Sequence, residues 1–159
     1  MAGMRSPAQI AFDPAGDPLA VRVWCGHAQV GTYDLRLYQS TRGEPVAGWS
    51  FHGPLRTPEQ DTFVLPEPAG GNLKRVVRCR FRIGVLPPDQ TYTTYVTVLQ
   101  GPRIIGDLVQ RGEATDPTVS VVMLAKFVLP RAVPTSASFP TESDEDEPCT
   151  DPWRVSSPR

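Results

Sequence analysis

The residues best suited to bind a charged partner lie in one stretch, "KRVVRCRFRIGV", at residues 74–85. Lys74, Arg78, Arg80 and Arg82 share one parity in this stretch. Because successive side chains of a β-strand point to opposite faces, a strand here would present these cations on one face. The other face would be buried and apolar, with Val77, Cys79, Phe81, Ile83 and Val85. A row of cations could meet nucleic-acid phosphates, an anionic lipid surface or an acidic protein patch.

The same stretch also has a purely structural interpretation, which the sequence favours over a binding site. Antiparallel sheets keep one polar face, and charged edge strands discourage aggregation. Nucleic acid is not an expected partner, because the cationic parity lacks the interleaved aromatic residues that usually bind single strands. If the face is a site, the expected partner is another protein with an acidic surface.

Two aromatic residues, Trp24 and Tyr38, fall on the polar parity of their predicted strands. Exposed aromatic rings on a sheet face can stack on sugar rings or anchor a protein interface. The alternative, which we favour, is that an additional strand such as residues 118–128 covers them.

The C-terminal segment, residues 130–159, is rich in Pro, Ser and Thr and contains the acidic run "ESDEDE" at residues 142–147. We predict a disordered tail, because its few apolar residues could not offset the entropy of ordering. One hypothesis is that the acidic run lies transiently over the basic strand. The alternative is a solubilising tail. Ser143 precedes Asp144, Glu145 and Asp146 and would suit an acidophilic kinase.

The sequence holds no motif that predicts catalysis or metal binding. It lacks a G-x-S-x-G elbow and a phosphate-binding glycine loop, and its two histidines are His27 and His52. Cys25 and His27 do not have the spacing of a zinc site, so we expect no metal and no cofactor. Cys79 is better interpreted as a small core residue.

Alternation of apolar and polar residues predicts an all-β fold, with one antiparallel sandwich over residues 8–129. No window shows a sustained helical period. Turn residues separate the predicted strands at 19–25, 29–38, 46–52, 62–65, 74–85, 91–100, 103–110 and 118–128.

Two segments share one pattern at an offset of 75 residues, "VRVWCGHAQVGTY" from Val21 and "VTVLQGPRIIGDL" from Val96. We expect two β-hairpins, each turning at its first glycine, with the second glycine allowing a bulge or a close approach. Similar constraints on two hairpins explain the likeness more simply than gene duplication does.

After the basic strand comes "IGVLPPDQTYTTYVTV", residues 83–98. The order of Leu86, Pro88 and Tyr92 resembles the corner between strands E and F of immunoglobulin-like and fibronectin type III sandwiches. The resemblance implies a sandwich of seven to eight strands in which the Tyr92 ring fills one end and its hydroxyl bonds the upstream backbone. No Cys follows two residues after Tyr92, so no immunoglobulin-type disulfide is expected.

These patterns together predict a non-enzymatic interaction or adaptor module, which binds through a sheet face, an edge strand or hairpin loops. A sandwich that recognises a carbohydrate or an anionic lipid is the alternative, and a small hydrolase or transferase comes third. No apolar run has the length of a signal peptide or of a transmembrane segment, so a cytoplasmic location is expected. The sequence is compatible with both a monomer and a homo-oligomer.

Overall fold

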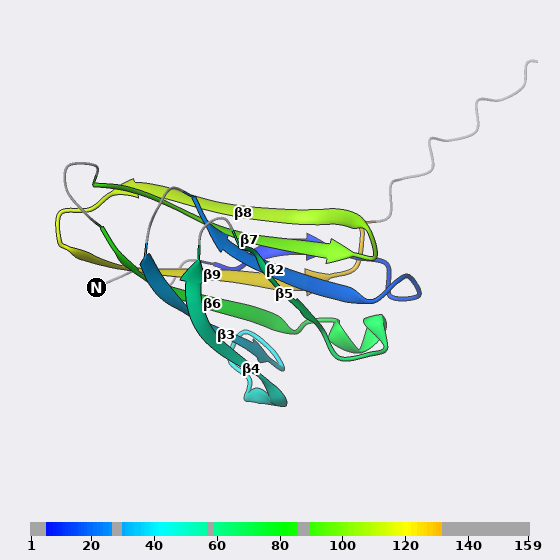
Figure 1. Ribbon diagram of the computed structural model, residues 1–159. Coiled ribbons are helices and arrows are strands. Elements are labelled where there is room, and N and C mark those ends of the chain that lie inside the picture. The colour runs from blue at the N-terminus through cyan, green and yellow to red at the C-terminus, as the bar shows by residue number, and fades with distance from the viewer. Residues whose placement is uncertain (1–5, 27–29, 57–58, 86–89, 132–159) are drawn as a thin grey trace, which may run out of the picture.

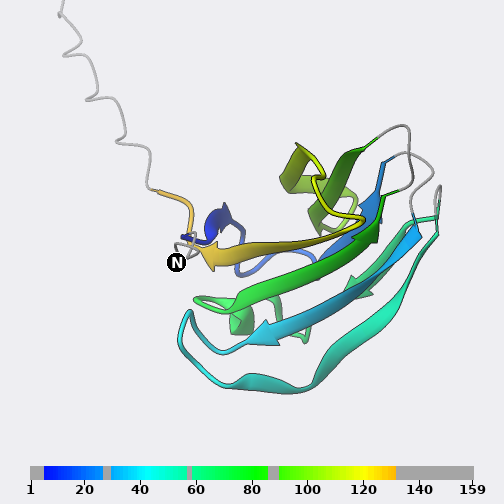
Figure 2. The same cartoon turned by 90° about the vertical axis from the view of Figure 1, so that its left-hand side faces the viewer.

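The computed structural model describes residues 6–26, 30–56, 59–85 and 90–131. Two β-sheets form two layers in these residues (Figures 1 and 2). The five-stranded sheet has the order β1 (Ala8–Ala11), β9 (Thr118–Val128), β6 (Val76–Gly84), β3 (Val30–Tyr38) and β4 (Pro45–Arg56). The four-stranded sheet has the order β5 (Asp61–Val64), β2 (Leu19–Cys25), β7 (Thr91–Gln100) and β8 (Arg103–Glu113). One turn of 3₁₀ helix, Ala69–Asn72, lies between β5 and β6. The all-β prediction is confirmed.

Strand β1 is the element that the sequence did not predict. Its four residues, AQIA, bury Ile10 and show too little alternation to stand out. The strand forms because it pairs in parallel with β9, with Ile10 opposite Phe127. The five-stranded sheet is therefore mixed, whereas a purely antiparallel sandwich was expected.

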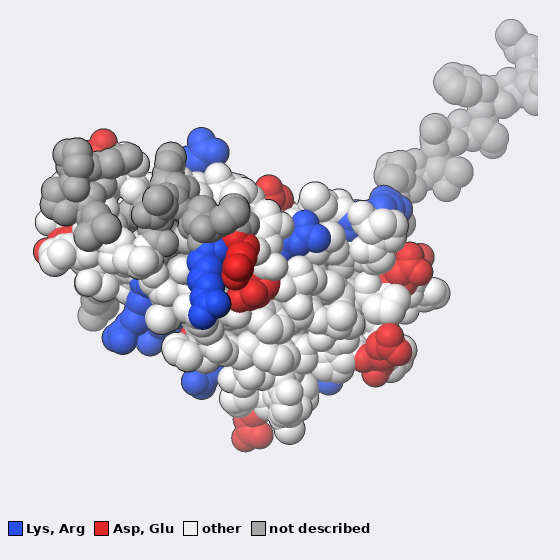
Figure 3. All heavy atoms as spheres, in the orientation of Figure 1, with Lys and Arg blue, Asp and Glu red and all other residues white. Residues whose placement is uncertain are grey.

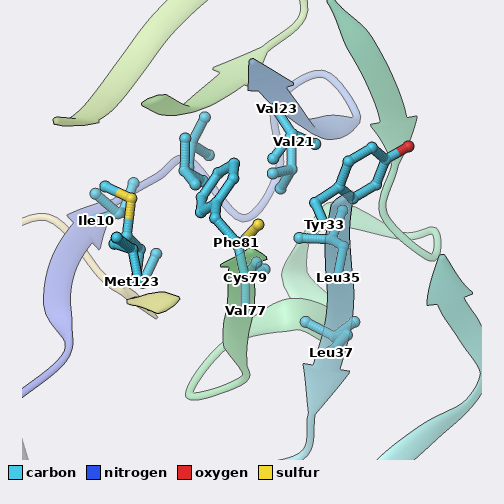
Figure 4. Close-up of a cluster of buried hydrophobic side chains, with 14 of the residues drawn as sticks. Ile10, Val21, Val23, Tyr33, Leu35, Leu37, Val77, Cys79, Phe81 and Met123 are labelled. Carbon is cyan, nitrogen blue, oxygen red and sulfur yellow. The ribbon is translucent and has the colours of Figure 1, made fainter. Parts of the chain in front are cut away.

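The core lies between the two sheets and is built by the predicted alternation. On β6, the residues Val77, Cys79, Phe81 and Ile83 are buried. Figure 4 shows Cys79 and Phe81 on the side of β6 that faces Val21 and Val23 of β2. Burying a large apolar side chain stabilises a fold by about 1.5–3 kcal/mol. This burial decides which face of each strand is left for function.

The two similar segments do not form two hairpins. β2 pairs with β5 and β7, whereas β3 pairs with β4 and β6, so the chain crosses between sheets after Cys25. The second segment does form a hairpin, in which β7 and β8 pair around Gly101 at a φ of 56°. A register shift opposite Val98 and Leu99 gives the expected bulge near Gly106.

One side of the sandwich is closed by aromatic residues from the edge strands β4 and β5. Trp49 packs edge-on to Phe51, and Phe51 stacks on Phe63 with ring centroids 4.3 Å apart. The Trp49 indole Nε1 donates a hydrogen bond to the Val64 carbonyl oxygen at 2.9 Å. Tyr33 also reaches this side, where its hydroxyl donates to Asp61 Oδ2 at 2.7 Å.

No helix in the described part of the chain is long and apolar enough to span a membrane. The tail prediction for residues 132–159, including the acidic run and Ser143, falls outside the described residues. So do His27 and two residues of the corner motif, Leu86 and Pro88.

Candidate interaction face

The basic strand is the central strand of its sheet. β6 pairs with β3 on one side and with β9 on the other. The interpretation of this strand as a charged edge is therefore wrong. Arg78, Arg80 and Arg82 instead lie in the middle of the outer face of the five-stranded sheet. The register with β3 and β9 determines which residues lie beside each arginine.

The neighbouring strand β3 adds a fourth arginine to this face. In the β3–β6 register, Arg36 lies opposite Arg78 and Asp34 lies opposite Arg80. We call Arg36, Arg78, Arg80 and Arg82 together the basic face. Residues of β9 that carry no carboxylate, Ser120, Val122 and Leu124, flank it on the other side.

Lys74 does not belong to the row that the sequence predicted. The residue precedes β6, has a φ of 68° and is exposed. Its backbone N–H donates to the Phe127 carbonyl oxygen at 2.9 Å. The chain therefore turns at Lys74, and the strand begins two residues later at Val76.

Sequence reasoning missed Arg36, although a signal was present. The segment "DLRLY" at residues 34–38 alternates, with Leu35 and Leu37 fully buried, so Arg36 must face outward with Asp34 and Tyr38. The pairing of β3 with β6, which local alternation does not reveal, brings this second polar row beside the first.

Positive charge exceeds negative charge on the basic face. One ion pair occurs there among the described residues, between Arg36 Nε and Asp34 Oδ1 at 3.2 Å. The hydrogen bond from Arg36 to Asp34 and their opposite charges raise the pKa of the guanidinium. No ion pair with a described residue engages Arg78, Arg80 or Arg82, so three guanidinium groups are left to bind an external anion.

Two open depressions lie side by side on the basic face. The larger, of about 360 Å³, takes in Ser50 and His52 of β4 together with Arg80 and Arg82. The smaller, of about 130 Å³, takes in Tyr38 and Arg78. Asp34, Arg36 and Arg80 line both depressions. The surface can therefore receive polar groups along its length.

The two candidate aromatic residues lie on opposite faces of the sandwich. Tyr38 is half-buried beside the basic face, whereas Trp24 lies on the outer face of the four-stranded sheet. Trp24 stacks on Tyr95 with ring centroids 3.7 Å apart and planes 5° apart. Strand β9 covers neither residue, because it extends the five-stranded sheet beside β6. The expected covering strand is therefore wrong.

The described thiols are not placed for nucleophilic chemistry. Cys79 is fully buried, and burial raises the pKa of its thiol well above its ordinary value. Cys25 is buried as well. Within the described ranges, no three His, Cys, Asp or Glu side chains gather as a metal site requires.

The corner motif can be followed at Tyr92. The chain passes from β6 in one sheet to β7 in the other, and Tyr92 packs against the core at the start of β7. Its ring lies over Gly112 of β8, where an added β-carbon would come within 2.5 Å of the Tyr92 hydroxyl. Tyr92 thus packs against the core and β8 at the start of β7.

No model of a known protein family matches this chain, and no curated protein or solved structure gives a match either.

Proposed function

We propose that this protein is a non-enzymatic interaction module whose basic face binds an acidic, extended segment of another protein. The observation that carries the proposal is the row Arg78, Arg80 and Arg82 on a central strand, with no carboxylate paired to it among the described residues.

The spacing of the row suits an extended partner. Alternate residues of a β-strand lie about 6.6–6.8 Å apart. Alternate carboxylates of an extended acidic peptide have the same repeat, so a peptide lying along β6 could place one carboxylate at each guanidinium. Arginine suits this role because its planar group binds carboxylates bidentately. Arg36 and the depressions on β3 and β4 widen the surface.

The chain itself carries a segment of this chemistry. The acidic run at residues 142–147 places Glu142, Asp144 and Asp146 at a spacing of two. Competition between this run and a partner would make the tail a regulator of the face. A chain ending at Arg131 would then bind an acidic peptide more tightly than the full chain does.

Recognition of a carbohydrate has weaker support. Trp24 and Tyr38 lie on opposite faces and cannot form one stacking platform. Recognition of an anionic lipid would use the same arginines as the acidic peptide, so anionic vesicles are the comparison ligand in the test below.

We also propose that the sandwich is of immunoglobulin-like type. In that fold, strands C, F and G share a sheet, C′ can extend it, and B and E lie in the other sheet. Here β3, β6, β9 and β4 would take the places of C, F, G and C′, with β2 and β5 as B and E. The hairpin of β7 and β8 is then an addition between F and G, so Tyr92 at the start of β7 does not open strand F as the sequence resemblance implied.

The test measures binding of a fluorescent peptide of alternating Glu and Ser by anisotropy. We expect Arg78→Gln, Arg80→Gln and Arg82→Gln together to weaken binding about tenfold or more, since three exposed charge contacts contribute roughly 0.5 kcal/mol each. Binding by the unmodified chain should also weaken steeply as salt rises.

The matched control changes Arg42, Arg103 and Arg131 to Gln, three exposed arginines outside the basic face. This variant has the same net charge and should bind within about threefold of the unmodified chain. Equal loss in both variants would indicate attraction by net charge alone and would contradict the proposal. Binding to vesicles but not to the peptide would favour the lipid alternative.

A further inference from the structure

Strand β8 is a long edge strand, and the part that follows its bulge near Gly106 is regular. The other edge strands are less suited to pair with a further strand. β1 and β5 have four residues each, and β4 contains Pro45 and Pro54. Short strands and prolines are common means of preventing edge-to-edge pairing. β8 has eleven residues, contains no proline and pairs with β7 alone among the described strands.

The outward side chains of β8 follow a pattern that is symmetric about Val109. Asp107, Val109 and Arg111 are exposed, while Leu108 packs against the core. An acidic and a basic residue thus stand two positions before and two positions after an apolar residue. The bulge near Gly106 precedes this segment, so Asp107–Arg111 pairs regularly with β7.

We propose that the β8 strands of two copies of this chain pair antiparallel around a two-fold axis at Val109. In this register Asp107 lies opposite Arg111 of the second copy, and Arg111 lies opposite Asp107 of the second copy. The axis thus relates two directly opposed ion pairs, and such cross-strand pairs each contribute roughly 0.2–1 kcal/mol. Interfaces of this type bury the same patch on both copies.

The pairing would also continue an apolar row across the joined sheets. Trp24 lies opposite Tyr95, and Tyr95 lies opposite Val109, which is 44% exposed. In the dimer, Val109 would meet its own copy on the same outer face and would lose this exposure. Strand β8 lies along the top of the view in Figure 1, and the same view in Figure 3 shows charged groups of both signs interspersed with uncharged surface.

Asp107 is already positioned for this contact. Thr97 Oγ1 donates to Asp107 Oδ1 at 2.9 Å from the neighbouring strand. This bond orients the carboxylate on the outer face and leaves its second oxygen to accept from a guanidinium across the axis.

Charge exchange tests the register. Sedimentation equilibrium of the full chain should give a mass that rises from 17.4 kDa toward twice that value with concentration. Asp107→Arg alone and Arg111→Asp alone should each weaken association about tenfold, because like charges then face each other across the axis. The double variant D107R/R111D should recover association to within about threefold.

Val109→Lys supplies an independent variant that leaves the core unchanged, since its side chain is on the surface. It should abolish association by placing two ammonium groups at the axis. Thr97→Val, which removes the hydrogen bond to Asp107 and keeps every charge, should still associate. Circular dichroism would confirm that each variant folds. A monomer at every concentration, or association that neither charge reversal weakens, would overturn the proposal.

Discussion

At Gly31, strands β3 and β6 lie so close together that a side chain would not fit between them. A β-carbon at Gly31 would overlap the Arg82 carbonyl oxygen on β6, and this contact is with backbone that a rotamer change cannot relieve. The glycine therefore permits the close pairing of β3 and β6, which brings Arg36 beside the basic row.

We predict that Gly31→Ala lowers the free energy of unfolding by about 1–3 kcal/mol, the usual cost of forcing extra atoms into a packed site. Gly84→Ala is the control, because a β-carbon there would make ordinary contacts with Val30. It should be neutral or stabilise by up to about 1 kcal/mol, since alanine restricts the unfolded chain. Urea unfolding of both variants makes the comparison, and equal stabilities would contradict it.

At the scale of elements, the edge strands β4 and β5 are held together by Trp49 and its neighbours. Trp49 is buried, whereas Trp24 is half-buried on an outer face. The two indoles therefore have different structural roles although both belong to β-strands.

We predict that Trp49→Ala destabilises the fold by about 3–5 kcal/mol, because it removes a buried aromatic ring and leaves the Val64 carbonyl without its donor. Trp24→Ala should cost less, about 1–2 kcal/mol, since it loses a stacked pair and part of its burial. Thermal unfolding of both variants gives the order. If Trp24→Ala destabilised the fold more than Trp49→Ala does, the stacked pair on the outer face would contribute more to stability than the aromatic cluster of β4 and β5.

At the scale of the whole molecule, two buried acids link stability to alkaline pH. Burial raises the pKa of the Cys79 thiol from its ordinary value of 9.0. Burial, and then the hydrogen bond to Asp61, raises the pKa of Tyr33 from its ordinary value of 10.0. Each group stays protonated in the folded state at a pH where the unfolded state has lost its proton. Their stabilisation is thus present below pH 9 and is lost as pH rises.

We predict that the free energy of unfolding falls above about pH 9, by up to about 1.4 kcal/mol per pH unit for one proton. Cys79→Ala removes the first titrating group, so its decline should begin near pH 10, where Tyr33 still contributes. Denaturant titrations at pH 8, 9 and 10 distinguish the two chains. The same onset in both would show that Cys79 does not link folding to pH.

The buried face of β6 could be predicted from the sequence alone. Alternation predicted that Val77, Cys79, Phe81 and Ile83 face inward, and the structure confirms all of them. This inference works because side-chain direction along a strand is a local property of the backbone. The same local rule predicted the outward positions of Arg78, Arg80 and Arg82.

The neighbours of each strand depend on long-range pairing, which the sequence did not reveal. Backbone hydrogen-bonding groups are the same in every residue, so a local pattern cannot distinguish a central strand from an edge or show that β2 and β3 belong to different sheets. Long-range pairing placed β6 in the centre, brought Arg36 to the basic row and put Trp24 on the opposite face from Tyr38. It also formed β1, whose four residues become a strand through their contact with β9.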